Sequence, residues 1–312
     1  MPATRKPKAL LPGATMRMIS PASPPDAEKL LRGLAELRRL GFTAETSPAM
    51  PATSDYFAAS AQDRSKELAS ALGEKSSAAI ICTRGGFGST YLVDELSGAI
   101  PRCAPKILLG YSDITSLQIY LWQKRGWTGF YGPMVAAGLD AGAGAAGGYD
   151  ESSLRNAISV TRGGWTLDLD GEMLAPGEAR GVILGGCMTL VEATLGTPWE
   201  LRTRGAILLL EDRGMKPYQV DRVLTHLRQA EMFAGVRGII LGEFPECDAA
   251  AGSPSVRDVC KRILGELGIP IVWGARVGHT ARAMLTIPLG VRAKLRSRGA
   301  GKLDILEPAV SK

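Results

Sequence analysis

Ser112 stands where a serine can act as a nucleophile. It follows an apolar run at residues 106–109 that predicts a strand, and it precedes residues 114–124, which predict a helix. At a sharp turn between a strand and a helix, a serine hydroxyl is exposed and the helix amides point at an oxyanion formed beside it. The run Gly-Tyr-Ser-Asp-Ile-Thr lacks the second glycine of the G-x-S-x-G pattern. It fits equally well a helix N-cap, in which the side chain of Ser112 or Asp113 closes the first turn.

A serine nucleophile needs a base, and the chain contains only two histidines. His226 lies inside a predicted helix at residues 219–233 among neighbours at core spacing, which favours a half-buried structural side chain. His279 follows Gly278 in a loop after a predicted strand at residues 270–273. Catalytic groups are commonly placed in such loops, but position alone leaves a structural role for His279 equally open.

The third residue of such a site would be a carboxylate that fixes the imidazole tautomer and supports its positive charge. Glu211 and Asp212 end the apolar run at residues 206–210, so a strand would deliver them to its carboxyl end. A carboxylate buried there would be costly without a partner. The pair can also simply cap the strand or the turn at Gly214.

A glycine-rich loop, Arg84-Gly85-Gly86-Phe87-Gly88, follows a predicted strand at residues 78–83. Such a loop could cradle a phosphate, but it has neither a GxGxxG motif with its downstream acid nor the Lys-Ser/Thr of a P-loop, which disfavours a nucleotide. In the other interpretation, a glycine amide of this loop approaches a substrate carbonyl as an oxyanion donor.

Strands and helices alternate with short connections in the first half of the chain, which is typical of a parallel sheet covered on both faces. The further elements predicted there are strands at residues 14–20 and 42–46 and helices at 26–40, 63–72 and 88–96. Functional groups collect at the carboxyl ends of such strands. The Arg84 loop and Ser112 both fall at that edge.

A Gly/Ala-rich linker is predicted at residues 136–148, and the pattern changes beyond it. Turn-rich strands at 165–169 and 181–184 come first, followed by helices at 188–195 and 256–267 and strands at 206–210 and 238–242. We therefore predict two domains, residues 1–150 with Ser112 and residues 151–312 with Glu211 and His279.

The composition disfavours several other classes of protein. With 312 residues, 45% of them apolar, the chain is long enough to bury two cores. Its net charge of +6 is concentrated near the chain ends, at residues 5–8 and 292–302, where charge is readily solvated, and few aromatic residues accompany it, so nucleic-acid binding is not expected. Five scattered cysteines without a CxxC predict neither disulfides nor a metal site. Without a signal-peptide or membrane-span pattern, we expect a cytoplasmic protein that needs no membrane and no cofactor.

Together these runs resemble the LD-carboxypeptidase family of serine peptidases, which includes muramoyltetrapeptide carboxypeptidases and microcin C immunity peptidases. The resemblance spans nearly the whole chain and depends on the order and spacing of short motifs. Besides the runs above, they are Leu11-Pro12-Gly13, Ser20-Pro21-Ala22-Ser23-Pro24, Tyr131-Gly132-Pro133-Met134, Gly185-Gly186, Leu195-Gly196-Thr197-Pro198, Leu210-Glu211-Asp212, Tyr218-Gln219-Val220-Asp221-Arg222, Gly268-Ile269-Pro270, Gly278-His279 and Pro288-Leu289-Gly290.

The resemblance implies a Ser112, Glu211, His279 triad and an oxyanion hole made by the amides of Asp113 and of Gly85 or Gly86. It also implies an α/β fold, with an N-terminal parallel-sheet domain of flavodoxin-like or Rossmann-like type and a second, β-rich C-terminal domain. A homodimer is expected.

The substrate that the resemblance implies is a murein tetrapeptide, which would lose its terminal D-alanine during cell-wall recycling. A groove for the free carboxylate of that peptide should contain arginine, and Arg84 and Arg276 are the candidates. The sequence departs from the family pattern at Phe87, Cys187 and Met215, which could alter substrate preference.

Two other functions stay open. An immunity-type peptidase that hydrolyses an aminoacyl-nucleotide antibiotic would need an aromatic platform for the base, for which Trp165, Trp199 and Trp273 are candidates. The same α/β scaffold could also serve as a non-catalytic ligand-binding module.

Overall fold

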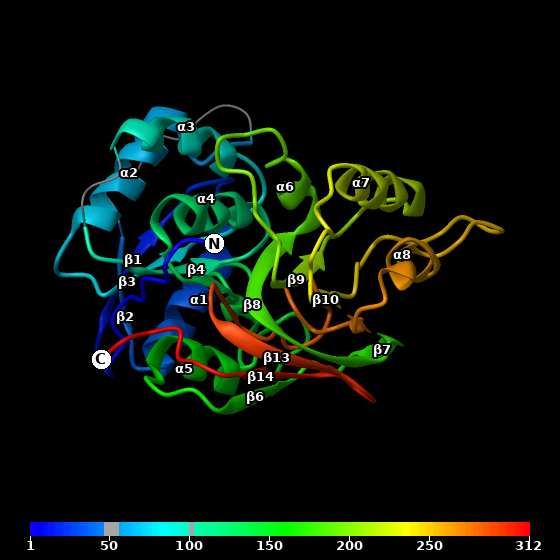
Figure 1. Cartoon of the computed structure of the whole chain (residues 1–312). Coiled ribbons are helices and arrows are strands. Elements are labelled where there is room, and N and C mark those ends of the chain that lie inside the picture. Colours follow the sequence, from blue (N-terminus) through cyan, green and yellow to red (C-terminus); the bar gives the residue numbers. More distant parts are fainter. Residues whose placement is uncertain (47–55, 100–102) are drawn as a thin grey trace.

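Two β-sheets form the framework of the computed structural model, which describes residues 1–46, 56–99 and 103–312 (Figure 1). The first sheet has the strand order β12-β5-β4-β3-β1-β2, and β1 to β5 run parallel. The order 2-1-3-4-5 is the flavodoxin-like one. The strands are β1 (Thr15–Ile19), β2 (Thr43–Thr46), β3 (Ala79–Cys82), β4 (Ile107–Gly110), β5 (Gly129–Tyr131) and the antiparallel edge strand β12 (Ile287–Leu289).

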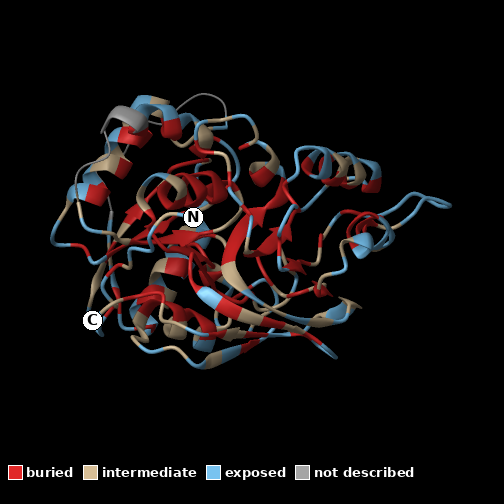
Figure 2. Cartoon of the chain, in the orientation of Figure 1, coloured by how far each residue is buried: buried red, intermediate tan, exposed pale blue. Residues whose placement is uncertain are grey.

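Helices cover both faces of this sheet, because its strands are apolar on both sides. Ile80 and Cys82 of β3 pack with apolar side chains of α2, α3 and α4, whereas Ala79 and Ile81 face the core that contains α1 and α5. The helices are α1 (Ala27–Arg39), α2 (Ala61–Gly73), α3 (Ser89–Ala99), α4 (Thr115–Arg125) and α5 (Glu151–Ser159). Figure 2 shows the buried strands at the centre of this arrangement.

The second sheet has the strand order β6-β14-β13-β8-β9-β10-β11-β7. Its central strands, β8 (Gly177–Cys187), β9 (Ala206–Glu211), β10 (Gly238–Leu241) and β11 (Ile271–Trp273), are parallel. The outer strands β6 (Trp165–Asp168), β7 (Glu172–Ala175), β13 (Arg292–Ser297) and β14 (Lys302–Ile305) are antiparallel to their neighbours. The helices α6 (Met188–Glu192), α7 (Pro217–Gln229) and α8 (Val256–Leu264) complete this half.

The α/β fold class predicted from the sequence is confirmed, with a parallel sheet in the first half and a second sheet in the other. The boundary near residue 150 stays a prediction. The second half of the chain contributes a strand to the first sheet, since β12 pairs with β5. Residues 136–148 are not a free linker, because they contain the short 3-10 helix Leu139–Ala141, which packs against α1.

The basic cluster at residues 292–302 forms a hairpin rather than a solvated tail. Ala293 and Leu295 of β13 are fully buried, and the charged residues that alternate with them, Arg292, Lys294 and Arg296, remain partly or fully exposed. Lys294 pairs with Glu178 at 2.7 Å, and Arg296 pairs with Asp304 at 2.5 Å. Alternation along the strand therefore explains these charges, and the sequence had not predicted this hairpin.

No helix within residues 1–46, 56–99 and 103–312 is both long and apolar enough to cross a membrane.

Candidate active site

Ser112 lies on a strained turn directly after β4. Its backbone φ is +61°, in the left-handed region that a non-glycine residue adopts only at a cost of about 1–2 kcal/mol. A 3-10 turn (Ser112–Ile114) leads from the strand into α4, and no side chain caps either helix start. The backbone N–H of Ser112 donates to the Tyr131 hydroxyl oxygen at 3.2 Å. This bond helps to hold the serine at the carboxyl edge of the first sheet against the strain in its backbone.

Asp113 caps a different helix from the one expected. Its carboxylate accepts a hydrogen bond of 2.7 Å from the N–H of Ser89, the first residue of α3, so it ties α3 to the serine turn. Burial raises the pKa of this carboxyl, although the hydrogen bonds from Ser89 oppose the shift. The sequence interpretation of Ser112 or Asp113 as the cap of α4 is therefore wrong.

Glu211 and His279, both in the second half of the chain, are joined by hydrogen bonds. Glu211 is the last residue of β9, and its side chain has no exposed surface. Its carboxylate accepts hydrogen bonds from the His279 ring Nδ1 at 2.8 Å, the His279 backbone N–H at 2.9 Å and the Tyr131 hydroxyl at 2.5 Å. Three donors offset the cost of burying this carboxylate. With Nδ1 as the donor, the other ring nitrogen of His279 is free to accept a proton.

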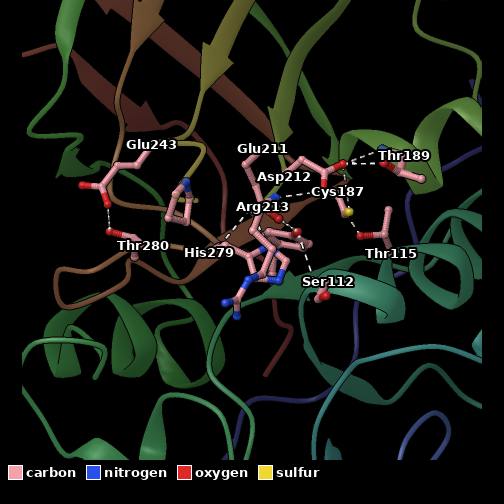
Figure 3. A network of polar contacts seen from close by, with 12 residues as sticks. Ser112, Thr115, Cys187, Thr189, Glu211, Asp212, Arg213, Glu243, His279 and Thr280 are labelled. Carbon is pink, nitrogen blue, oxygen red and sulfur yellow. Dashed lines mark hydrogen bonds and ion pairs between the residues drawn. The ribbon is translucent and has the colours of Figure 1, made fainter. Parts of the chain in front are cut away.

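The loop that carries His279 is fixed at both ends. Gly278 has φ +58°, and a Cβ atom there would lie 2.3 Å from Glu211 Cδ, so only glycine allows this close approach. On the other side, Glu243 accepts hydrogen bonds from the Thr280 hydroxyl, the Ala281 N–H and Arg282. Figure 3 shows the hydrogen bond between Glu243 and Thr280, the residue that follows His279.

Ser112 and His279 come from different halves of the chain and meet at the same two cavities (Figure 3). No hydrogen bond joins the Ser112 hydroxyl to the His279 ring, both of which belong to the described part of the chain. Hydrogen bonds between a nucleophile and its base are often long without substrate and shorten when it binds. His226 is not part of this site, since its ring is about half exposed and contacts Glu192 on α6.

The glycine loop after β3 lies against the serine turn. A Cβ atom on Gly85 would lie 3.2 Å from Ser112 Oγ and 3.4 Å from the Asp113 amide nitrogen. The Gly85 carbonyl accepts from the Ser23 N–H at 3.3 Å. In a trans peptide the C=O and N–H point in opposite directions, so the Gly86 N–H points away from Ser23. Gly86 itself has φ +107° and lines both cavities.

The two cavities differ in character, and we name them for it. The apolar cavity has a volume of about 680 Å³, and its walls include Phe87, Tyr91, Leu190 and Ala193. The polar cavity has a volume of about 770 Å³, and Asp26, Lys29, Asp140 and Glu246 are among its lining residues. They meet at a shared set of residues, Arg84, Gly86, Ser112, Arg213 and His279.

Two arginines lie at this junction, and only one was predicted. Arg84 lines both cavities, as a carboxylate-binding residue should. Arg276 lines neither, because its guanidinium is paired with Asp150 at 3.3 Å and bonded to the Ala283 carbonyl. Arg213 lines both and was missed, although its place directly after Glu211 and Asp212 was a usable signal.

The positions that depart from the family pattern are divided between the apolar cavity and its surroundings. Phe87 and Cys187 line the cavity, and burial raises the pKa of the Cys187 thiol well above its usual range. Met215 does not line the cavity, but its sulfur lies 3.7 Å from the hydroxyl oxygen of Thr189, a lining residue whose hydroxyl donates to Asp212.

The three tryptophans predicted to form an aromatic platform for a nucleobase lie away from the junction, where Phe87 and Tyr91 are the aromatic residues that line the apolar cavity. Trp165, Trp199 and Trp273 line neither of the two cavities. Trp273 is instead stacked on Phe244 with ring centroids 5.6 Å apart. Within the described ranges, no group of three or more His, Cys, Asp or Glu side chains could hold a metal ion.

Comparison with known proteins gives the class of this chain and then its family. The LD-carboxypeptidase N-terminal domain model matches residues 16–132, and the C-terminal domain model matches residues 180–295. These models describe carboxypeptidases, which are peptide hydrolases. The chain belongs to the LD-carboxypeptidase family, as its ordered motifs predicted.

Individual relatives agree with this assignment. The probable murein peptide carboxypeptidase of Bacillus subtilis is 33% identical, over 98% of this chain and 95% of its own. Two solved structures share the fold over 95% or more of both chains. MccF in complex with glutamyl sulfamoyl guanosine has a TM-score of 0.87 at 24% identity, and muramoyltetrapeptide carboxypeptidase from Oxalobacter formigenes has 0.80 at 23%.

Proposed function

We propose that this chain is a serine carboxypeptidase in which Ser112 is the nucleophile, His279 the general base and Glu211 the carboxylate that orients the base. The observation that carries the proposal is the buried Glu211 carboxylate, which is bonded to both the ring and the backbone of His279 at a junction lined by Ser112. A buried carboxylate with this geometry fixes one imidazole tautomer and stabilises the imidazolium.

In the proposed reaction, the free ring nitrogen of His279 takes the proton of Ser112 while Oγ attacks the scissile amide carbonyl. The N–H groups of Asp113 and Gly86 stabilise the resulting oxyanion. The direction of the Gly86 N–H, opposite to the carbonyl that Ser23 holds, favours it over Gly85. His279 then protonates the leaving amine, and water hydrolyses the acyl-enzyme by the same base.

The proposed substrate is a murein tetrapeptide, cleaved at the L,D-amide bond to release its terminal D-alanine. The name of the Bacillus subtilis relative supports a murein peptide. Arg84 at the junction supplies positive charge for the free carboxylate of the terminal residue, and Arg213, whose guanidinium is paired with Glu246, also lines both cavities. Arg276, which lines neither cavity, is the weaker of the two predicted candidates.

The aminoacyl-nucleotide alternative is supported by the likeness to MccF and by the aromatic rings of Phe87 and Tyr91 in the apolar cavity. The peptide substrate is preferred because the more similar relative, at 33% identity, is named a murein peptide carboxypeptidase. The cytoplasmic location remains a prediction from the sequence pattern and the homodimer a prediction from the family resemblance, and light scattering of the purified protein tests the second.

The decisive experiment incubates the enzyme with a defined murein tetrapeptide and follows the loss of one D-alanine by mass spectrometry. We expect cleavage by the wild type and by His226→Ala, which replaces the histidine outside the site, and none by Ser112→Ala. A serine-reactive phosphonate should label Ser112. Full activity of Ser112→Ala would refute the mechanism, and a phosphonate that labels nothing would favour a ligand-binding module.

A further inference from the structure

An exposed cluster of aromatic rings borders the apolar cavity. Phe87 is 44% exposed and Tyr91 is 50% exposed, and their rings meet edge to face at 6.0 Å. Phe57 packs on both of them, at 6.0 Å from Phe87 and 5.6 Å from Tyr91. Large apolar side chains gathered at the mouth of a cavity mark a binding surface more often than isolated exposed ones do.

This aromatic rim is held in place by a buried cation. Arg64 is 1% exposed and donates to the carbonyls of Pro21, at 2.6 Å, and Gly88, at 2.8 Å. Its guanidinium lies 4.9 Å from the centroid of the Phe57 ring. Because Gly88 follows Phe87 directly, Arg64 fixes the loop that carries Phe87. The same guanidinium also holds the ring of Phe57. A rim fixed before a ligand arrives loses little entropy on binding.

The rim continues inward as an apolar wall. Leu190 and Ala193, from α6 and the turn after it, line the same cavity as Phe87 and Tyr91, and this space reaches Ser112. On the other side of the serine, the polar cavity carries several charged side chains. The two sides of the scissile bond therefore meet different surfaces. Aromatic and aliphatic side chains, together with Asp94 and Asp212, line one cavity, whereas Asp26, Lys29, Asp140 and Glu246 line the other.

We infer that the apolar cavity binds the side chain of the leaving residue and that the enzyme prefers a terminal D-residue with a large apolar or aromatic side chain over D-alanine. This inference rests on the proposed carboxypeptidase function. The acyl part of a murein peptide carries several charged groups and fits the polar cavity. A methyl group would leave most of a cavity of about 680 Å³ unfilled, whereas an aromatic side chain would pack against the rim.

The test compares two tetrapeptides that differ only in the last residue, D-phenylalanine or D-alanine. Their dissociation constants are measured by calorimetry with Ser112→Ala, which does not turn over, and kcat/KM is measured with the wild type. We expect the D-phenylalanine peptide to bind roughly tenfold more tightly and to react with a higher kcat/KM.

The variants Phe87→Ala and Tyr91→Ala, each made in the Ser112→Ala background, should reduce this preference to about twofold or less. Tyr218→Ala is the matched control, since this tyrosine is 62% exposed on α7 and lines neither cavity. Equal binding of the two peptides, or a preference that survives both rim variants, overturns the inference. If the wild type cleaves neither peptide, the proposed function fails, while the ratio of dissociation constants still decides the inference.

Discussion

Replacing Tyr131 by phenylalanine tests how the two halves of the site are joined. The hydroxyl of this buried tyrosine donates to Glu211 Oε1 at 2.5 Å and accepts from the Ser112 N–H at 3.2 Å. The Tyr131 hydroxyl therefore links the nucleophile turn to the Glu211 carboxylate through one oxygen atom. Burial, together with the nearby charge of Glu211, raises the pKa of Tyr131 well above its usual value, so the hydroxyl stays protonated and remains a donor.

The expected magnitude follows from the two bonds that Tyr131→Phe removes. A hydrogen bond to a charged carboxylate contributes about 2 kcal/mol to stability, and the unpaired Ser112 N–H adds a penalty of about 1 kcal/mol. We therefore expect the free energy of unfolding to fall by about 3 kcal/mol. Without its acceptor, the Ser112 turn can relax from its positive φ, so kcat should fall at least roughly tenfold while KM changes little.

Urea denaturation gives the stability change, and steady-state hydrolysis of the tetrapeptide gives the kinetic change. Tyr120→Phe is the control, because Tyr120 is also buried but its hydroxyl makes no hydrogen bond to the described protein, and its loss should cost under about 0.5 kcal/mol. A Tyr131→Phe protein as stable and as active as this control would show that the hydroxyl does not couple the two halves.

Two further predictions concern the glycine loop and the tyrosines. Gly86→Ala should abolish most activity, because a Cβ atom there would lie 2.3 Å from Ser23 Oγ and 2.6 Å from Ser23 Cβ, a clash that rotation of the serine cannot relieve. The control is Gly142→Ala, which has φ +92° and open space around it and should lose stability but keep activity. Equal kcat values for the two variants would contradict the prediction. Four of the seven tyrosines have pKa values raised mainly by burial, namely Tyr111, Tyr120, Tyr131 and Tyr149. These phenols hold their protons more tightly when folded, so stability should fall as pH rises above about 10, and absorbance titration should show only part of the tyrosines ionising before unfolding.

The sequence predicted the elements that carry the site better than the edges of the sheets. Apolar runs bounded by glycine located β3, β4 and β9, because a parallel strand that is buried on both faces consists almost entirely of apolar residues. The sequence did not identify β7 or the β13–β14 hairpin. Alternating charges such as Lys294 and Arg296 look like a solvated tail until Glu178 and Asp304 are placed opposite them.

The sequence identified the candidate residues, but it could not identify the contacts that position them. Two histidines left little choice of base, and the family motifs selected Glu211. The local sequence pattern could not reveal the roles of Tyr131 and Arg64. Their partners lie far away in the sequence, and only the fold brings them together. Arg276 illustrates the opposite error, in which a loop arginine near His279 is already occupied by Asp150.

The Gly185-Gly186 motif, which the sequence interpretation used only as part of the family resemblance, explains how Glu211 reaches the serine turn. A Cβ atom on Gly186 would lie 2.7 Å from Thr115 Oγ1 and 3.0 Å from Tyr131 Cε2, so only glycine lets β8 pass this close to the first residue of α4. The N–H of the next residue, Cys187, then donates to Thr115 Oγ1 at 3.1 Å, and Cys187 is paired in register with Glu211 on β9. The register of the second sheet is thereby fixed against the helix that begins at the serine turn, and the carboxylate is placed by backbone packing rather than by a loop.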